Sequence, residues 1–408
     1  YIDPTYMIRS VPANAWDSTY CANLAQNAVH AAMAGYSGVT VGKVYGRYVY
    51  LPIYAITMQK GRRVNPSGRW FHRLIETTLQ PDFAPDGIHR EAESPSSIDV
   101  LRNLSEPSSI NEVLTPGDEV IRMECANLSE RFTPAKIPNN HPHLSEEICL
   151  DQVSWTTQTL MRMNKRDDRG RKYYQMLRGG PRKLLHFNPA KCAAVIVTCG
   201  GLCPGLNSVI RELVMTLTSY SVPRIYGCKG GFKGMASPET WIKLTPEVVR
   251  DIHMSGGTIL VSDRGNPPHS EIAKSLKRMS ATQFFVIGGD GTHRGAMAVF
   301  QEMQKLGHEC AVVGVPKTID NDIPFLDRSF GYKTACTEAT KAIQSAFVEA
   351  SSNTSCIGLV KLMGRHCGWI ALEAAQAARF VDICLLPEME ISLPKVLTHA
   401  HHLIKTRG

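Results

Sequence analysis

Short apolar runs alternate with amphipathic helical patterns through the second half of the chain. We expect strands at 193–197, 224–228, 258–261, 284–287, 311–315, 356–361 and 381–386. Between these runs, apolar residues recur at helical spacing, most clearly over 269–279, 296–306 and 339–350. Continuous apolar runs bounded by glycine or proline are typical of parallel strands that are buried on both faces. The pattern therefore predicts an α/β fold with doubly wound, mostly parallel sheets.

The first 57 residues also carry patterns of regular structure. Apolar residues on one face predict a helix over 17–34, with Asp17 as its N-cap and Gly35 as its stop. Short strands are expected at 39–41 and 48–51. A later stretch, 93–116, is rich in Ser, Pro and Glu and has too little apolar content to bury itself.

Length, composition and charge limit the possible functions less strictly than the hydrophobic pattern limits the fold. The 408 residues, 43% hydrophobic and 20% charged, can form one large or two ordinary globular domains. The net charge of +8 is spread along the chain, so it favours anionic sugar phosphates and nucleotides over nucleic acid. No apolar run reaches the length of about 20 residues that a membrane helix needs. We therefore expect neither a nucleic acid nor a membrane as a partner.

The 12 cysteines include no CxxC pair, and several lie within apolar runs. This usage favours buried free thiols in a reducing compartment. Cys199 and Cys203 flank a glycine loop, but a metal site there would lack further ligands nearby.

Two loops carry the most chemistry. Gly288-Gly289-Asp290-Gly291-Thr292 follows the apolar run 284–287, and the 317–322 loop, Lys-Thr-Ile-Asp-Asn-Asp, follows the run 311–315. Each loop is expected at the carboxyl end of a buried strand, the edge at which open α/β sheets bind ligands. The glycines allow close approach of phosphate oxygens, and Asp290 could hold Mg²⁺. The second loop adds two carboxylates and an ammonium group, an inventory that suits phosphoryl transfer.

Alone, the first loop also resembles loops of NAD kinases and lipid kinases, or a tight turn in which Asp290 or Thr292 caps a helix. Together with Met363-Gly364-Arg365 and the glycine loop at 200–207, the two loops resemble the phosphofructokinase family, and within it the ATP-dependent plant and protist type. The glycine loop has the spacing of a P-loop, but Leu206 and Asn207 stand where Lys and Ser or Thr are required. The resemblance implies two Rossmann-like lobes.

The resemblance implies ATP as the phosphoryl donor, Mg²⁺ as the cofactor and O1 of fructose 6-phosphate as the acceptor, a glycolytic kinase reaction that gives fructose 1,6-bisphosphate. It assigns the nucleotide to Gly201, Arg264, Gly265, Gly289, Asp290, Gly291 and Thr292, with Asp290 as the Mg²⁺ ligand. It assigns the sugar phosphate to Tyr6, Met7, Ile8, Arg9, Thr318, Ile319, Asp320, Met363, Gly364 and Arg365.

Within that set, Asp320 is the expected catalytic base, and Asp322 has either a direct role or a capping role. Without the matching YIDPTYMIR context, Arg9 would be interpreted as a surface arginine at a frayed terminus. Gly291 favours ATP, because an aspartate there, as in pyrophosphate-using relatives, would repel the α-phosphate of a nucleotide. Lys317 resembles the lysine of pyrophosphate-dependent enzymes, so a pyrophosphate-dependent phosphofructokinase is the near alternative.

The order of segments departs from the family. YMIR comes first here, whereas in relatives it follows the other motifs. We expect residues 1–57 to complete a sugar-phosphate lobe at 316–408, with a nucleotide-binding lobe at 190–315 and a linker with an amino-terminal-extension-like region at 58–189. The chain is interpreted either as a circular permutant or as a window from a tandem or misassembled longer protein. It begins at Tyr1 and stops after a helical pattern, so we expect it to be a piece of something longer.

A family strand that carries an Ala-Glu-Gly sequence and a sugar-contacting glutamate has no counterpart here. A second hypothesis is therefore a nucleotide- and sugar-phosphate-binding subunit without turnover. A third, a lipid or NAD kinase, is disfavoured by the 317–322 and Met-Gly-Arg loops.

The resemblance also implies a homo-oligomer, a tetramer, in the cytoplasm, with a plastid as the alternative compartment. However, Cys356 stands where bacterial relatives carry an arginine that reaches across a subunit interface. This departure argues against a shared site of the bacterial kind.

Overall fold

The computed structural model describes residues 1–58, 61–86, 119–157, 172–263, 265–364 and 366–407. Its strands are β1 (Val39–Val44), β2 (Arg47–Pro52), β3 (Glu119–Arg122), β4 (Ile137–Pro138), β5 (Trp155–Thr157), β6 (Lys172–Arg178), β7 (Leu184–Leu185), β8 (Ala193–Thr198), β9 (Arg224–Cys228), β10 (Ile242–Lys243), β11 (Gln283–Gly288) and β12 (Ala311–Pro316). Its α-helices are α1 (Thr5–Arg9), α2 (Ala15–Met33), α3 (Ile53–Thr57), α4 (Arg69–Thr78), α5 (Leu206–Ser219), α6 (Gly231–Gly234), α7 (Pro246–Val249), α8 (His269–Arg278), α9 (Asp290–Lys305), α10 (Tyr332–Ser351), α11 (Trp369–Ala378) and α12 (Leu393–Arg407).

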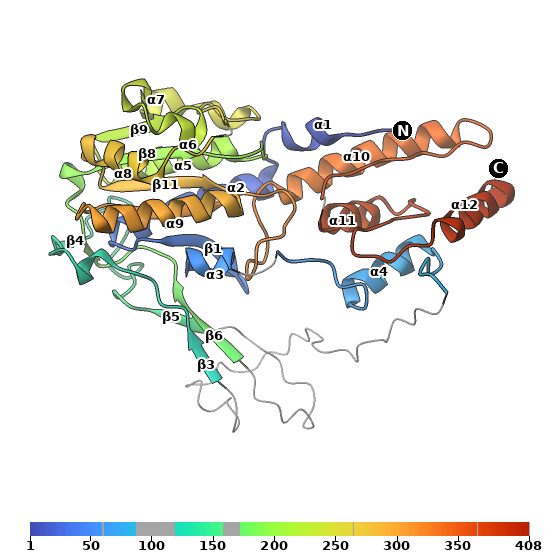
Figure 1. Ribbon diagram of the computed structural model, residues 1–408, viewed down its shortest axis with the longest axis horizontal. Coiled ribbons are helices and arrows are strands. Elements are labelled where there is room, and N and C mark those ends of the chain that lie inside the picture. The colour runs from blue at the N-terminus through green and yellow to red at the C-terminus, as the bar shows by residue number, and fades with distance from the viewer. Residues whose placement is uncertain (59–60, 87–118, 158–171, 264, 365, 408) are drawn as a thin grey trace.

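One large mixed sheet organises the fold (Figure 1). Its strand order is β10-β9-β8-β11-β12-β1-β2-β6-β3, and β5 also pairs with β6. The five strands from β9 to β1 in that order are mutually parallel, whereas β2 pairs antiparallel with β1 and β6 pairs antiparallel with β2. The predicted α/β fold with a mostly parallel central sheet is confirmed in this part of the chain.

Helices cover both faces of this sheet, as a doubly wound fold requires. Alternate residues of β8 point to opposite faces of the sheet and are buried under different helices. Ala194 and Ile196 lie in the core that includes α2 and α5, whereas Val195 and Val197 lie in the core that includes α8 and α9. All four side chains are fully buried, and each large one contributes about 1.5–3 kcal/mol of burial free energy. The continuous apolar runs of the sequence reflect this two-sided burial.

The first segment of the chain lies in the middle of the sheet. Strand β1 pairs with β12 on one side and β2 on the other, in the register Val39 to Val313. Strands from residues 1–57 therefore share a sheet with strands of 190–315, and β6 extends the same sheet. The proposed division into lobes stays a prediction.

Helix α2 is present as predicted, but its cap is different. Its N-cap is Asn14, whose Oδ1 accepts a hydrogen bond of 2.9 Å from Asp17 N. The prediction that Asp17 caps this helix is wrong. Asp17 is fully buried and instead accepts hydrogen bonds at the start of α10, from Gly331 N at 2.9 Å and Thr334 N at 2.7 Å. A carboxylate stabilises that helix end because it accepts from backbone N–H groups left without intrahelical partners.

Helices α10, α11, α12 and α4 lie beyond one end of the sheet, on the right of Figure 1. In the described part of 317–408 there is no strand, so the strands predicted at 356–361 and 381–386 are wrong. Among the described residues, the backbone of 356–361 pairs only with Ile2, which donates to Leu359 O at 2.8 Å and accepts from Lys361 N at 3.0 Å. A strand needs a continuous partner, and apolar residues without one stay exposed here, Ile357 at 59% and Leu359 at 58%.

The strand predicted at 258–261 is also wrong. Val261 has a φ of 54° and donates its N–H to Thr258 O at 3.2 Å, so the segment closes a turn. The side chain of Asn207 accepts from Ile259 N at 3.0 Å and takes the place of a strand neighbour. Apolar content alone did not distinguish this turn from a strand.

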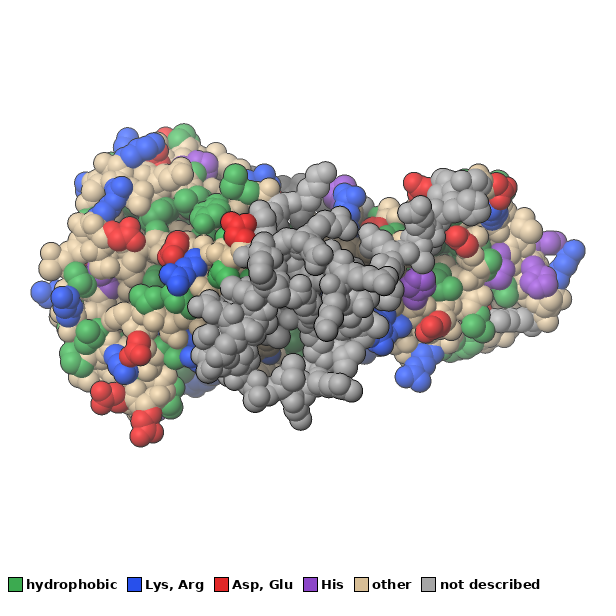
Figure 2. Space-filling model, turned by 90° about the horizontal axis from the view of Figure 1, so that it is seen from below, with side chains coloured by type: hydrophobic (Ala, Val, Ile, Leu, Met, Phe, Trp, Pro, Cys, Tyr) green, Lys and Arg blue, Asp and Glu red, His purple; other side chains and the backbone are tan. Residues whose placement is uncertain are grey.

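None of the helices in the described residues is long and apolar enough to span a membrane. All cysteines are free, and all but Cys125 and Cys356 are buried. On the face drawn in Figure 2, acidic and basic side chains are interspersed over the described residues.

Candidate functional site

The two carboxylate-bearing loops begin at neighbouring strand ends. Strands β11 and β12 pair in parallel with Gly288 opposite Pro316, and Lys317 N donates to Gly288 O at 2.9 Å. Asp290 is the first residue of α9, with Gly289 as its N-cap. The adjacency expected from the two apolar runs is therefore confirmed at the level of the strands.

The glycine loop after β8 lies next to two of the cations expected at the site, Lys317 and Arg9. Lys317 Nζ donates a hydrogen bond to Gly201 O. A Cβ placed on Gly200 would lie 3.5 Å from Lys317 Nζ, and one on Gly201 would lie 3.8 Å from Arg9 Nη1. Three segments that are distant in sequence thus meet at this loop. The interpretation of Arg9 as a surface residue at a frayed terminus does not fit, because Arg9 is packed against Gly201.

Lys317 is 6% exposed, and burial lowers the pKa of its ammonium group. Arg9 lowers this pKa further, whereas Cys203, Cys199 and Asp320 raise it. A cation that has lost hydration gains more from an anionic ligand than an exposed cation would. This corner of the site is therefore suited to a phosphate oxygen.

Asp290 lies on the open side of the site. Its side chain is 53% exposed and forms an ion pair with Arg294, one turn later in α9. Thr292 is half-buried and packs closely under Gly288. A Cβ placed on Gly291 would meet no atom within 4 Å, so the space beside this residue is open.

His293 holds the backbone of the loop that precedes Asp290. The sequence analysis did not identify this residue. It is fully buried, with Nδ1 3.0 Å from Gly289 O and Nε2 3.0 Å from the Thr40 hydroxyl. Because a carbonyl oxygen can only accept, Nδ1 carries the proton and Nε2 accepts. Burial lowers the pKa of His293, which keeps the ring neutral. The one sequence signal for it is its place four residues after Gly289, on the inward face of α9.

The Asp320 loop is held by contacts from several elements. Asp320 N donates to Thr318 Oγ1 at 3.1 Å, and Asp320 O accepts from Cys367 Sγ at 3.2 Å. Asn321 has a φ of 55°, and its Oδ1 accepts from Ser329 N at 3.1 Å. These bonds fix the backbone on both sides of the Asp320 carboxylate.

The Met363-Gly364 turn lies close to the same loop. Gly364 has a φ of 108°, and a Cβ there would lie 2.3 Å from Cys367 O, so only glycine fits. Cys367 in turn donates to Asp320 O, which connects this turn to the expected base. The sequence analysis missed Cys367, because a lone cysteine two residues after the Met363-Gly364-Arg365 motif gives no recognisable signal.

The remaining predicted residues differ in how accessible they are. Tyr6 and Met7 are 73% and 64% exposed, whereas Ile8 is fully buried and Ile319 is 6% exposed. The Ile8 side chain is therefore part of the core and is closed to a ligand. Gly265 packs against Lys233, which forms an ion pair of 3.0 Å with Asp263. Arg264 and Arg365 lie outside the described residues.

Comparisons relate the chain to known proteins. A family model described as Phosphofructokinase matches residues 193–408. ATP-dependent 6-phosphofructokinase 5, chloroplastic, of Arabidopsis thaliana is 49% identical over 287 residues, which are 69% of this chain and 50% of that protein. ATP-dependent 6-phosphofructokinase of Amycolatopsis methanolica is 47% identical over 56% of this chain and 51% of that protein.

Among solved structures, the pyrophosphate-dependent phosphofructokinase of Marinobacter aquaeolei is 23% identical, with a TM-score of 0.45, over 53% of this chain and 58% of that one. The chain spans about half the length of the curated relatives named above. The family model covers more than half of the chain, and its match contains the glycine loop, both carboxylate loops and the Met-Gly-Arg motif. On this evidence the chain belongs to the phosphofructokinase family.

Proposed function

We propose that the protein is a kinase that transfers the γ-phosphoryl group of ATP to O1 of fructose 6-phosphate, giving fructose 1,6-bisphosphate. The observation that carries this proposal is the meeting of Lys317 and Arg9 at the Gly200-Gly201 backbone, beside the neighbouring strands β11 and β12 whose following loops carry Asp290 and Asp320. The printed names of the curated relatives, ATP-dependent 6-phosphofructokinases, support the same reaction.

Asp320 is proposed to accept the proton of the sugar O1 hydroxyl as that oxygen attacks the γ-phosphorus. A carboxylate is basic enough because the transition state of phosphoryl transfer is loose, so the proton leaves late. The hydrogen bonds from Asp320 N to Thr318 and from Cys367 to Asp320 O hold the loop in place during this step. Positioning of this kind supplies much of the catalysis in phosphoryl transfer.

Arg9 and Lys317 are proposed to neutralise charge on the transferring phosphoryl group and on the sugar phosphate, from the buried side of the site. Thr318, Met363 and Gly364 would orient the sugar, together with Arg365 by resemblance. Residues 1–57 thus complete a sugar-phosphate site that 316–408 alone would lack. The planar fork of an arginine suits this role because it can donate two parallel hydrogen bonds to a phosphate.

Mg²⁺ is proposed to bind between Asp290 and the nucleotide. In the described residues no group of three His, Cys, Asp or Glu side chains could hold a metal without a ligand. One exposed carboxylate suits Mg²⁺, which is usually held in proteins by one or two carboxylates together with substrate phosphates and water. Bound there, the ion would withdraw charge from the β- and γ-phosphate oxygens.

Gly291 supports ATP over pyrophosphate as the donor. The open space beside it leaves room for the part of a nucleotide beyond the β-phosphate, and glycine adds no charge. Lys317 supports the pyrophosphate alternative by resemblance. However, Lys317 donates a hydrogen bond to Gly201 O in the glycine loop. This contact is the same whether the phosphoryl donor is ATP or pyrophosphate, so it does not discriminate between them.

A donor comparison tests the proposal. The chain is incubated with fructose 6-phosphate, Mg²⁺ and either ATP or pyrophosphate, and fructose 1,6-bisphosphate is measured. We expect product with ATP, and a value of kcat/KM at least tenfold lower with pyrophosphate. Preference for pyrophosphate would overturn the donor assignment. Binding of both substrates without product would favour the non-catalytic subunit, the second candidate because the sequence contains no Ala-Glu-Gly strand with its sugar-contacting glutamate.

The assembly and the compartment are also proposals. A homo-tetramer in the cytosol or a plastid agrees with the family and with the chloroplastic form among the relatives. Sedimentation of the purified chain tests the assembly directly.

A further inference from the structure

Arg62 binds the backbone of the loop that carries Asp320. Its own N–H donates to Asp322 O at 2.7 Å. Its guanidinium Nη1 donates to Leu326 O and, at 3.2 Å, to Asp327 O. A single residue thus holds the loop at three backbone carbonyls that follow Asp320 closely in sequence.

The same guanidinium group reaches a second element of the site. It lies over the ring of Trp369, with Cζ 5.4 Å from the ring centroid, which is a favourable cation–π contact. Trp369 is the first residue of α11, the helix that follows the Met363-Gly364 turn. Arg62 therefore connects the Asp320 loop to the element that follows the other loop assigned to the sugar phosphate.

The backbone on both sides of Arg62 is fixed. A Cβ placed on Gly61 would lie 3.1 Å from Asp322 O, so this glycine packs directly on the loop. Val64 is 2% exposed, and its N–H donates to Glu388 Oε1 at 2.9 Å. The Arg62 side chain therefore reaches the loop from a backbone with a defined position.

The environment of Arg62 strengthens these contacts. Burial lowers the pKa of its guanidinium group, and the Asp327 carboxylate raises it. An arginine is not deprotonated in proteins, so Arg62 is a charged donor at every pH at which the protein works. Hydrogen bonds from charged donors are roughly twice as strong as those between neutral groups. The neighbouring Arg63 is exposed.

We propose that Arg62 is a positioning residue for phosphoryl transfer. It holds the Asp320 loop and the start of α11 in the arrangement in which the Asp320 carboxylate reaches the acceptor hydroxyl. The inference rests on the function proposed above, in which Asp320 accepts the proton of the sugar. Arg62 acts through backbone carbonyls and Trp369, and a displacement of the reacting groups by about 1 Å can lower the rate about 100-fold.

Arg62→Met tests the role, because it keeps an unbranched apolar side chain and removes the guanidinium donors. We expect kcat to fall about 10–100-fold. The dissociation constant of MgADP, measured by calorimetry, should stay within about twofold of wild type. The reason is that, among the described residues, the hydrogen bonds of Arg62 go to neither the glycine loop nor α9. Wild-type turnover in the folded variant would overturn the proposal.

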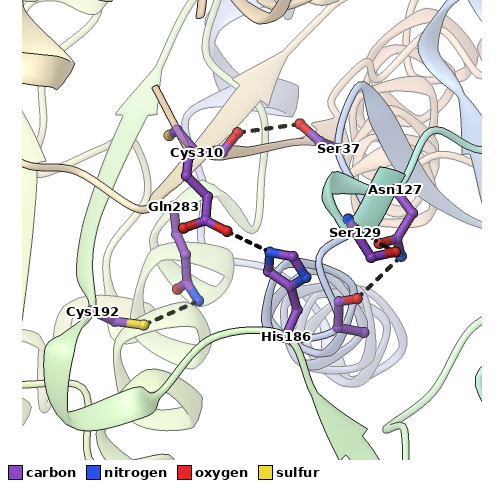
Figure 3. A network of polar contacts seen from close by, with 9 residues as sticks. Ser37, Asn127, Ser129, His186, Cys192, Gln283 and Cys310 are labelled. Carbon is purple, nitrogen blue, oxygen red and sulfur yellow. Dashed lines mark hydrogen bonds and ion pairs between the residues drawn. The ribbon is translucent and has the colours of Figure 1, made fainter. Parts of the chain in front are cut away.

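Two controls separate positioning from charge and from general stability. Arg63→Met makes the same change at the adjacent exposed position and should behave as wild type. The Ser37 hydroxyl donates to Cys310 O at 3.4 Å (Figure 3) and accepts from Val312 N at 2.9 Å. These contacts lie at the amino end of β12, whereas Asp320 follows its carboxyl end, so Ser37→Ala should lower stability and leave kcat unchanged. An equal loss of kcat in Ser37→Ala and Arg62→Met would reduce Arg62 to a stabilising residue.

Arg62→Lys covers the case in which Arg62→Met does not fold. It keeps the charge but loses the planar fork, so kcat should fall about 3–10-fold with MgADP affinity unchanged. Turnover equal to that of wild type would contradict the proposal.

Hydrogen exchange, followed by mass spectrometry, distinguishes failure of this inference from failure of the proposed function. In Arg62→Met, or in Arg62→Lys if only that variant folds, the amides of 320–329 should exchange at least about tenfold faster than in wild type, and those of β11 should not change. Unchanged exchange in the loop would refute the positioning contact even in a protein without turnover. Faster exchange together with a wild type that forms no product would instead overturn the kinase function.

Discussion

Lys317 is the residue at which β12, the glycine loop and the first segment of the chain meet. Its ammonium group donates to Gly201 O and is almost completely removed from water. Burial of a cation lowers the free energy of unfolding of the protein, but the same burial strengthens the attraction of Lys317 for an anionic ligand. The cost of burying Lys317 can be measured through the pH dependence of the free energy of unfolding.

Lys317→Met should change that pH dependence. In the folded state the lysine pKa lies below its usual value of 10.5, so the unfolded chain binds more protons between these two pKa values. The free energy of unfolding of wild type should therefore rise relative to Lys317→Met as pH increases toward 10.5, by at most about 1.4 kcal/mol per pH unit. Urea unfolding of both proteins from pH 7 to 10 measures the difference. A constant difference would show that the lysine titrates normally.

Asp320→Ala should lower kcat by about 10²–10⁴-fold and leave the dissociation constant of fructose 6-phosphate within about threefold of wild type. The reason is that the proposed base acts on a proton in the transition state, whereas other groups bind the phosphate. Steady-state kinetics and equilibrium binding measure the two effects separately. Asp322→Ala is the neighbouring comparison, and unchanged turnover in Asp320→Ala would remove this residue from the role.

Gly291→Asp should lower kcat/KM for ATP by at least about tenfold, because two like charges about 4 Å apart repel by about 1–4 kcal/mol at effective dielectric constants between those of water and a protein surface. Gly291→Ala is the control. The backbone there is helical, and an added Cβ meets no atom, so this variant should behave as wild type. Equal loss in both variants would point to the backbone instead of the charge.

Sequence patterns identified the charged residues of the site better than the residues that hold them in position. Asp290, Asp320 and Lys317 follow apolar strands, and their side chains carry the required charges, so they could be found directly. His293, Cys367 and the true partner of Asp17 act through contacts with residues far along the chain. Such contacts have no local periodicity, and no pattern within a short window could have predicted them.

At the scale of elements, Asp17 joins α2 to α10. Asp17→Ala removes the acceptor for Gly331 N, Thr334 N and the Thr334 hydroxyl, and it should lower the free energy of unfolding by about 1–3 kcal/mol. Ser345→Ala, at an exposed position in the middle of α10, is the control and should change it by less than about 0.5 kcal/mol. Urea unfolding distinguishes them. Similar small losses in both variants would mean that the cap contributes little.

From residue 190 onward, strands were predicted correctly wherever a parallel neighbour existed, whereas the parallel pair β3 and β6, in the region expected to be a linker, was not predicted. β8, β9, β11 and β12 match their apolar runs to within a residue or two, because each is paired and covered on both faces. The runs at 356–361 and 381–386 have the same composition but no described strand beside them. A sequence records the tendency to form a strand, and only the neighbouring backbone decides whether it forms.

At the scale of the whole molecule, the exposed run at 356–361 should promote self-association. Ile357 and Leu359 expose apolar side chains beside backbone that, within the described part of the chain, pairs only with Ile2, and such edges recruit other chains. Ile357→Lys combined with Leu359→Lys should lower the average mass at high protein concentration, measured by sedimentation velocity.

The control adds the same charge elsewhere, at the exposed residues Val248 and Met254 of the sheet-containing half. Val248→Lys combined with Met254→Lys should leave the mass close to that of wild type. An equal fall in both double variants would assign the effect to net charge, and no fall in either would show that the exposed run is inert.

The central place of β1 affects how the chain is made. Thr40 contacts Gly314 of β12, 274 residues later, so β1 emerges from the ribosome long before its parallel neighbour exists. At about 5–20 residues per second the wait is on the order of 15–55 s, during which β1 can pair with β2 but lacks its parallel partner on the other side. Pairing over so large a separation also slows folding itself. Newly made chains should therefore depend on chaperones that hold the first segment until β12 has been synthesised.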